Sequence, residues 1–265
     1  MITLIHTSKT MRPAVENNIT PLSRPILLDK ARVLAGYLQQ LSSKDIEKMM
    51  KISVKLAETT KELIAGWTDD LKLQRAAIDS FLGDIYSGLQ VGEWSDSDRK
   101  YADEHLRILS GLYGILKPLD GIYPYRFEMG YRLPDTKYAD LYKYWGVSIY
   151  DSLPENETII DLTAVEYGKT VTKYAETAPK KPNIVTPRFL TISPKTGVPT
   201  FVVVHAKVAR GAFASWMIRN RIEAIEQLKE FDEIGYQYDA VLSTDAIPVF
   251  VCKDFKGIGL SVRLT

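Results

Sequence analysis

The sequence predicts a mixed α+β fold, with a central sheet and a helical lobe combined in a single intertwined domain. Helix-forming segments dominate the first half of the chain, while helices and short β-branched segments interleave in the second half. No linker, internal repeat or low-complexity stretch divides the 265 residues. We therefore expect one domain over residues 1–265, with the helical lobe at about residues 26–90.

The first third of the chain is expected to contain one strand and several helices. The apolar run Ile2–His6 is typical of a short buried strand, and the polar residues 7–10 follow it as a loop. Residues 12–25 carry prolines and predict a further loop. Residues 26–67 have the spacing of two or three helices, and residues 69–89 that of one more.

The middle of the chain predicts a long helix that ends in a sharp turn. Ser95 and Asp98 form an S-x-x-D start signal, after which apolar residues recur at near-helical spacing. Pro118 and Gly121 then stop the helix. We expect one helix over residues 96–116.

The segment after this turn alternates between apolar and charged residues. In an extended chain, the charged face would carry Arg126, Glu128 and Arg132. Two arginines and a glutamate are costly to bury unless they are paired or hold a charged ligand. This face is therefore a candidate site.

The second half of the chain predicts alternating helices and strands. Strands are expected at residues 158–162, 184–192, 201–205 and within 236–253, and helices at residues 139–151 and 207–229.

Composition limits the kinds of function. The chain carries 34 basic and 33 acidic residues, so nucleic-acid binding would need a local basic patch. The single cysteine, Cys252, excludes an internal disulfide, and three widely separated histidines argue against a metal centre. Neither a metal nor a cofactor is expected. No apolar run is long enough to span a membrane and no signal peptide is evident, which predicts a cytoplasmic protein without membrane contact.

A strip of lysines is the first candidate site. Ser42 and Asp45 predict a helix start, and four lysines follow at intervals of four, three and four residues: Lys44, Lys48, Lys51 and Lys55. On one helix these side chains would line one side and could contact successive phosphates of a nucleic acid. The alternative is an ordinary solvated helix face.

A polar cleft assembled from separate segments is the second candidate site. Its expected members are Lys9, Thr10, Arg107, Arg126, Glu128, Arg132, Tyr167, Lys207 and Arg210. Lys9, Glu166 and Lys207 each lie just beyond a predicted strand, where ligands bind in sheet proteins with helical crossovers. The surplus of basic residues suits a phosphate, although a buried ion-pair network is the alternative. If the cleft is catalytic, Lys9 could act as base or nucleophile, and Glu128 or Glu166 as general acid or base.

Short motifs follow one another in a fixed order along nearly the whole chain. They are SKT at 8–10, KISVKLA at 51–57, FLGDIYSGL at 81–89, LSGLYGILKPLD at 109–120, PYRFEMG at 124–130, DLYKYWG at 140–146, EY at 166–167 and AKVARG at 206–211. Together they resemble the YaaA family of peroxide stress resistance proteins. The resemblance implies a DNA-binding protein of the oxidative stress response to hydrogen peroxide. It also implies a helix-hairpin-helix element at residues 41–60, although no glycine occurs there.

Two functions are consistent with these residues. The first is binding of duplex DNA, with low sequence specificity, through a basic groove and the lysine-lined helix. The second is an enzyme that acts on a nucleotide-like or other anionic small molecule in the cleft. No P-loop, nucleophile elbow or dinucleotide-binding glycine motif specifies a reaction.

Overall fold

A five-stranded sheet forms the centre of the molecule, in the order β6-β5-β1-β8-β9. The computed structural model describes residues 1–14, 16 and 22–257, so part of the expected loop over residues 12–25 lies outside the described residues. The parallel strands are β1 (Ile2–His6), β5 (Leu106–Ser110), β8 (Ile159–Asp161) and β9 (Ile184–Val185), and β6 (Gly114–Leu116) is an antiparallel edge. The predicted α+β class and the predicted strand Ile2–His6 are confirmed.

A second sheet lies toward the end of the chain and has the order β11-β10-β13-β12. Its strands are β10 (Arg188–Ile192), β11 (Pro199–Thr200), β12 (Tyr236–Tyr238) and β13 (Val249–Cys252). Phe189 and Phe250 stack at 5.5 Å on one face of this sheet, and Phe213 and Phe231 meet them edge-on or tilted. This cluster of rings is the core of the C-terminal part.

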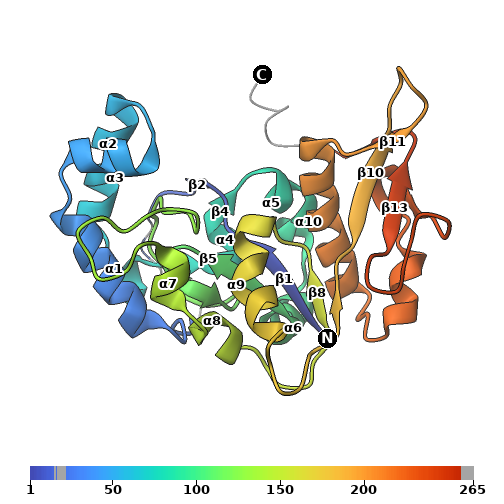
Figure 1. Ribbon diagram of the computed structural model, residues 1–265, viewed down its shortest axis with the longest axis horizontal. Helices are drawn as coiled ribbons and strands as arrows, with labels where there is room; N and C mark the ends of the chain where they lie inside the picture. Colours follow the sequence, from blue (N-terminus) through green and yellow to red (C-terminus); the bar gives the residue numbers. More distant parts are fainter. Residues whose placement is uncertain (15, 17–21, 258–265) are drawn as a thin grey trace.

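Helix α10 (Val203–Arg219) lies between the two sheets (Figure 1). Because neighbours cover it on several sides, it is apolar around nearly its whole circumference, and almost every residue from Ala206 to Ile218 is buried. It also packs closely on α5 (Asp84–Leu89): a Cβ atom at Gly211 would lie 1.8 Å from the Ile85 carbonyl oxygen. Among the described helices, none is both long and apolar enough to cross a membrane.

Three helices form a lobe at the end of the molecule opposite the second sheet (Figure 1). They are α1 (Leu28–Gln40), α2 (Ser43–Met50) and α3 (Val54–Ala65), as expected for residues 26–67. Ser42 and Asp45 form a capping box that starts α2. Lys51 ends α2 in the left-handed region at φ 53°, and Ser53 then caps α3. The lysine strip therefore lies on two helices and not on one.

The prediction of a single helix over residues 69–89 is wrong. This segment forms η1 (Leu71–Leu73), β3 (Arg75–Ala76), α4 (Ala77–Ser80), β4 (Phe81–Leu82) and α5. The two short strands pair with distant residues, β3 with β7 (Gly121–Ile122) and β4 with β2 (Thr10–Met11). Gly83 separates β4 from α5 with φ 137°, a backbone angle that side chains other than glycine rarely adopt.

The prediction of a long helix over residues 96–116 is correct only for the first half of this segment. α6 (Asp96–His105) begins with the predicted capping box of Ser95 and Asp98 and follows η2 (Val91–Glu93). From Leu106 the chain continues as β5 and then β6. All five β5 residues are buried between neighbouring strands, so this apolar run fits a central strand as well as a helix. Pairing with β1 and β6 makes this segment a strand.

The remaining elements agree with the prediction in most places. Residues 139–151 form α7 (Leu141–Trp145) and α8 (Ser148–Asp151), and later helices are α9 (Val165–Ala175), η3 (Ile225–Glu230) and η4 (Glu233–Gly235). Residues 184–192 are divided between the two sheets, because Pro187 cannot donate to a strand ladder. The strand expected at residues 201–205 is wrong, because α10 begins at Val203.

Candidate functional site

The carboxyl ends of β1, β5 and β8 meet at one edge of the central sheet. β1 lies between the other two strands, with His6 opposite Leu109 of β5 and Leu4 opposite Asp161 of β8. The chain leaves β1 toward β5 on one side and later returns to β8 on the other, an arrangement in which α/β proteins bind ligands. We call the polar residues at this edge the strand-end cluster: His6, Lys9, Arg126, Glu128, Asp161, Glu166, Tyr167, Lys207 and Arg210.

Lys9 and Glu128 form an ion pair in this cluster. The Lys9 Nζ atom lies 3.1 Å from Glu128 Oε2, and the hydroxyl of Tyr131 donates to the same carboxylate oxygen at 3.2 Å. Arg126 donates through Nη1 to the Lys9 carbonyl at 3.2 Å. The sequence placed these groups in separate segments, and the fold brings them into contact.

The start of α9 contributes Glu166 and Tyr167. Glu166 Oε1 accepts the Gly130 N–H at 2.7 Å, which ties α9 to the segment that carries Glu128. Tyr167 is buried, and its hydroxyl accepts a hydrogen bond from Thr7 at 3.3 Å. Burial raises the pKa of the Tyr167 phenol, so it stays protonated near neutral pH.

His6 is a member of the cluster that the sequence did not predict as a site residue. Its ring is buried, stacks on Tyr167 at 4.8 Å and accepts the Ala164 N–H through Nδ1 at 3.2 Å. Burial, and then the charges of Arg210 and Lys207, lower the pKa of His6 from 6.5 to about 3. His6 is therefore a neutral imidazole whose proton is on Nε2. Its position at the end of an apolar strand was the signal that could have indicated it.

α10 contributes two cations, Lys207 and Arg210, to the same edge of the sheet. Arg210 and Asp161 interact electrostatically, and burial lowers the pKa of the Arg210 guanidinium. Asp161 Oδ1 accepts from both the backbone N–H and the hydroxyl of Thr163, at 2.9 and 2.7 Å. Burial nevertheless raises the pKa of this carboxyl, and Arg210 partly opposes that shift.

Three residues expected in the cleft do not take part in the interactions of the strand-end cluster. Arg107 is on β5 and not on a helix, and its guanidinium donates to the carbonyls of Asp103 and Leu106 at 2.9 and 2.8 Å. These bonds turn it back toward α6 at the other end of the strand. Thr10 is exposed on β2, and Arg132 is exposed beside an isolated bridge to Asp140. No hydrogen bond or ion pair joins the side chain of any of the three to the strand-end cluster within the described part of the chain.

The four lysines of the lobe are all exposed. Lys44 and Lys48 share one side of α2, Lys51 occupies the turn, and Lys55 is in the first turn of α3. None of their ammonium groups forms an ion pair or hydrogen bond with another described residue. We call these residues the lobe lysines.

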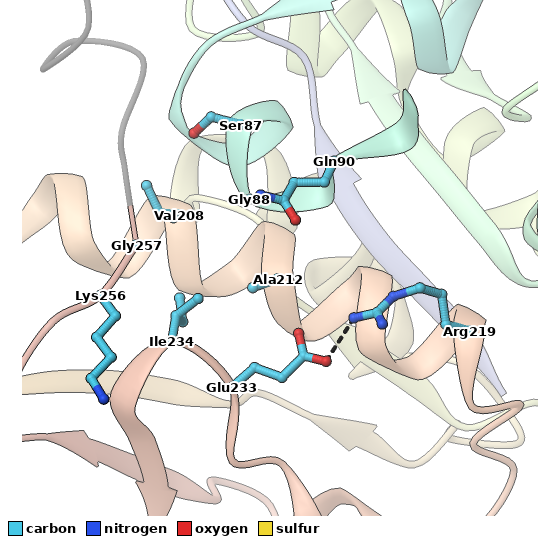
Figure 2. A pocket seen from close by; sticks show the side chains of 10 residues that line it. All are labelled: Ser87, Gly88, Gln90, Val208, Ala212, Arg219, Glu233, Ile234, Lys256 and Gly257. Atoms are coloured by element: carbon cyan, nitrogen blue, oxygen red, sulfur yellow. Dashed lines mark hydrogen bonds and ion pairs between the residues drawn. The ribbon is translucent and has the colours of Figure 1, made fainter. Parts of the chain in front are cut away.

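A small cavity of about 120 Å³ lies between α5, α10 and η4 (Figure 2). Arg219 and Glu233 form an ion pair of 2.6 Å in its lining, and Val208 and Ile234 give it an apolar side. A second hollow, of about 440 Å³, lies over the C-terminal sheet beside Gln237 and Lys253. The residues described as lining these two spaces include no member of the strand-end cluster. Among the described residues there is also no group of three His, Cys, Asp or Glu placed to hold a metal ion.

Comparison with known proteins identifies the family. A sequence profile described as peroxide stress protein YaaA matches residues 1–242. A UPF0246 protein of Salinispora tropica is 53% identical over 263 residues, which cover 99% of this chain and 98% of the relative. Relatives of the same description in a Marinomonas species and in Clostridium beijerinckii are 40% and 36% identical, each over 94% of this chain and 95% and 97% of their own lengths. The chain belongs to the family of the peroxide stress protein YaaA.

Proposed function

We propose that this protein binds duplex DNA, with little sequence preference, through the lobe lysines during the response to peroxide stress. The observation that carries the proposal is that all four lysines are exposed and that none is paired with a described acidic residue. Unpaired cations along a helical pair can each displace a counterion from DNA. Asp45 interacts electrostatically with Lys44 and Lys48, but its carboxylate accepts from the Ser42 N–H and hydroxyl at 3.0 and 2.5 Å, which keeps it at the helix start.

Salt dependence gives this proposal a quantitative test. If four phosphates are contacted, the slope of log affinity against log salt is about −0.9 per contact, and a fourfold rise in salt lowers the affinity on the order of 100-fold. Loss of two contacts reduces that change to about tenfold. The measurement is fluorescence anisotropy of a labelled duplex at 50 and 200 mM salt.

The variant pair for this test is Lys48→Glu with Lys51→Glu. A matched control reverses the charge of two exposed lysines outside the α2–α3 pair, Lys72 and Lys100. We expect binding to weaken and the salt slope to fall in the lobe variant only. Equal duplex affinity in wild type and lobe variant would refute the lobe as the contact surface. Equal losses of affinity in the lobe and control variants would show that only the net charge of the protein matters.

A second candidate function is an enzyme that acts on a nucleotide-like or other anionic small molecule at the strand-end cluster. The Lys9–Glu128 ion pair, with the hydroxyl of Tyr131 on the same carboxylate, favours it. A lysine and a carboxylate in contact can exchange a proton with a bound substrate. Glu166 is a further carboxylate at this edge of the sheet, and its contact with the Gly130 N–H fixes its position.

The test of this second function is turnover of nucleotides, followed by mass spectrometry. Lys9→Ala and Glu128→Gln should abolish turnover while leaving the circular dichroism spectrum unchanged. Wild-type turnover in both variants would exclude these residues from the chemistry.

A further inference from the structure

We propose that the cavity between α5, α10 and η4 binds a free α-amino acid with a small aliphatic side chain, such as alanine or valine. In this arrangement the carboxylate of the ligand contacts Arg219, its ammonium group contacts Glu233, and its side chain packs on the apolar wall. The inference goes beyond both functions proposed above and depends on neither. None of the described residues that line this cavity is a lobe lysine or a member of the strand-end cluster.

One side of α10 gives the cavity an apolar end and a charged end. Val208 and Ala212 are four residues apart and Arg219 follows seven residues later, so the three side chains lie along one side of the helix. Val208 and Ala212 are buried, whereas the Arg219 side chain is partly exposed. Ile234 of η4 adds a second apolar side chain next to Val208 and Ala212 (Figure 2). A ligand with one polar and one apolar end matches this distribution.

The Arg219–Glu233 ion pair keeps unused hydrogen-bonding groups. Arg219 donates through Nη2 to Glu233 Oε1 at 2.6 Å and through Nε to the Ser215 hydroxyl at 3.4 Å. Among the described residues, Nη1 of Arg219 has no acceptor and Oε2 of Glu233 has no donor. A guanidinium and a carboxylate side by side can therefore bind one group of each charge. This favours a zwitterion over a ligand that carries a single charge.

Gln90 supplies a third polar group. Its side chain extends from the end of α5 toward Glu233 and Arg219 (Figure 2). The side-chain amide forms no hydrogen bond with another residue of the described part of the chain. Because an amide both donates and accepts, it can complete the contacts of a carboxylate or of an ammonium group.

Two rarely adopted backbone conformations occur in the lining. Ile234 has φ 49° and ψ 24°, in the left-handed region, where a β-branched residue is a strained exception. Gln90 ends α5 in the same region, at φ 49°. The Ile234 carbonyl accepts the Lys256 N–H at 3.1 Å, which ties η4 to another segment of the lining. Strain of this kind persists where surrounding contacts enforce it, and it is concentrated at binding sites.

The size of the cavity limits the ligand. It measures about 120 Å³. A cavity of about 150 Å³ holds benzene, so this space suits a side chain no larger than that of valine. Lys256 also lines the cavity, but Figure 2 shows it on the far side of Ile234 from Arg219. One cation and one anion are therefore available at the polar end.

The experiment is titration calorimetry at pH 7.5 with L-alanine and L-valine. Two comparison compounds each lack one charge of valine: isobutyrate has no ammonium group and isobutylamine has no carboxylate. We expect an amino acid to bind, and each comparison compound to bind at least roughly tenfold more weakly, the loss expected for one hydrogen bond that involves a charged group. L-Tryptophan should not bind, because its ring exceeds the space.

Three results would overturn the inference. They are no binding of either amino acid at millimolar concentration, binding of isobutyrate or isobutylamine as tight as that of valine, and binding of tryptophan as tight as that of valine.

Variants locate the binding. Glu233→Gln keeps the shape of the side chain but removes the charge that faces the ammonium group, and it should weaken valine binding roughly tenfold. Ala212→Leu fills the apolar end and should abolish valine binding. If this variant fails to fold, Glu233→Gln still decides. Wild-type affinity in Glu233→Gln would place the amino acid elsewhere.

A matched control removes a different ion pair. Arg32→Met breaks the pairs of Arg32 with Asp29 and Asp69 beside the lobe and should leave valine binding unchanged. An equal loss of affinity in Arg32→Met and Glu233→Gln would refute the cavity as the site. Lys48→Glu with Lys51→Glu should likewise leave valine binding intact, so failure of DNA binding and failure of this inference are separate results.

Discussion

His6 should make the free energy of unfolding fall as the pH drops below neutral. In the folded protein the pKa of His6 is about 3, against 6.5 for an unperturbed histidine. Below pH 6.5 His6 therefore becomes protonated in the unfolded chain but stays neutral in the native state. The free energy of unfolding consequently rises with pH over this range and decreases as the pH falls. Between pH 7 and pH 5, the linkage relation gives a loss of about 2 kcal/mol from this residue alone. The loss continues until the pH approaches 3, where the native ring is also protonated.

Urea denaturation at pH 7 and pH 5 measures this loss. In His6→Gln the side-chain carbonyl can still accept the Ala164 N–H, but no group titrates at this position. The difference in unfolding free energy between the two pH values should then be about 2 kcal/mol smaller in the variant than in wild type. Burial also lowers the pKa of His205, but this contribution is common to both proteins and cancels. An equal pH difference in wild type and variant would refute the neutral, buried state of His6.

Three further predictions concern stability, each checked by the midpoint of urea unfolding. Gly211→Ala would place a methyl group 1.8 Å from a carbonyl oxygen of α5 and should cost about 3 kcal/mol, whereas Gly36→Ala, with no atom within 4 Å of its Cβ, should stabilise α1 by about 0.5–1 kcal/mol. The glycine prediction fails if both changes have the same sign. Ser95→Ala removes the capping box of α6 and should cost about 1 kcal/mol; no loss would mean that the box contributes nothing. Arg99→Met breaks a half-buried bidentate ion pair with Asp79, whose two hydrogen bonds are 2.8 and 2.9 Å long. It should lower the free energy of unfolding by about 1 kcal/mol at low salt and by less at high salt. A loss that does not depend on salt would indicate lost packing instead.

Local signals in the sequence predicted the parts of the fold that depend on neighbouring residues. The capping boxes at Ser42 and Ser95 start α2 and α6 as expected. The alternation around residue 126 is confirmed as well: Tyr125, Phe127 and Met129 are buried, while Arg126 and Glu128 stay partly exposed. These features need only the spacing of side chains along one segment.

The expectations that failed were those in which distant contacts outweigh local periodicity. The run from Leu106 to Ser110 has helical spacing but becomes a central strand, because β1 and β6 pair with it on both sides. Phe201 and Val203, typical of a strand, remain exposed at the start of a helix. A single segment cannot reveal whether a partner strand will be available.

The same division holds for the candidate site. Lys9 and Glu166 were recognisable as polar residues just beyond expected strands, and Glu128 as a charged residue of the alternating segment. The fold joins Lys9 to Glu128, and it joins Glu166 to the backbone of the segment that carries Glu128. Arg107 was expected in the same cleft, on a helix. It lies on strand β5 instead, and its guanidinium donates to the Asp103 carbonyl, away from the cluster. His6 was overlooked because an isolated histidine after an apolar strand carries no motif.

By itself, the sequence determined the α+β class, the family, the helix starts and the residue types available for chemistry, because these depend on composition and on short-range spacing. Only the tertiary structure decided which apolar runs become strands and which charged residues meet. It also decided that His6 is neutral. The pairing of β strands and the burial of a side chain depend on groups far away in the chain. For His6 these groups include Tyr167, which stacks on the ring, and Ala164, which donates to it, while the charges of Arg210 and Lys207 lower its pKa further.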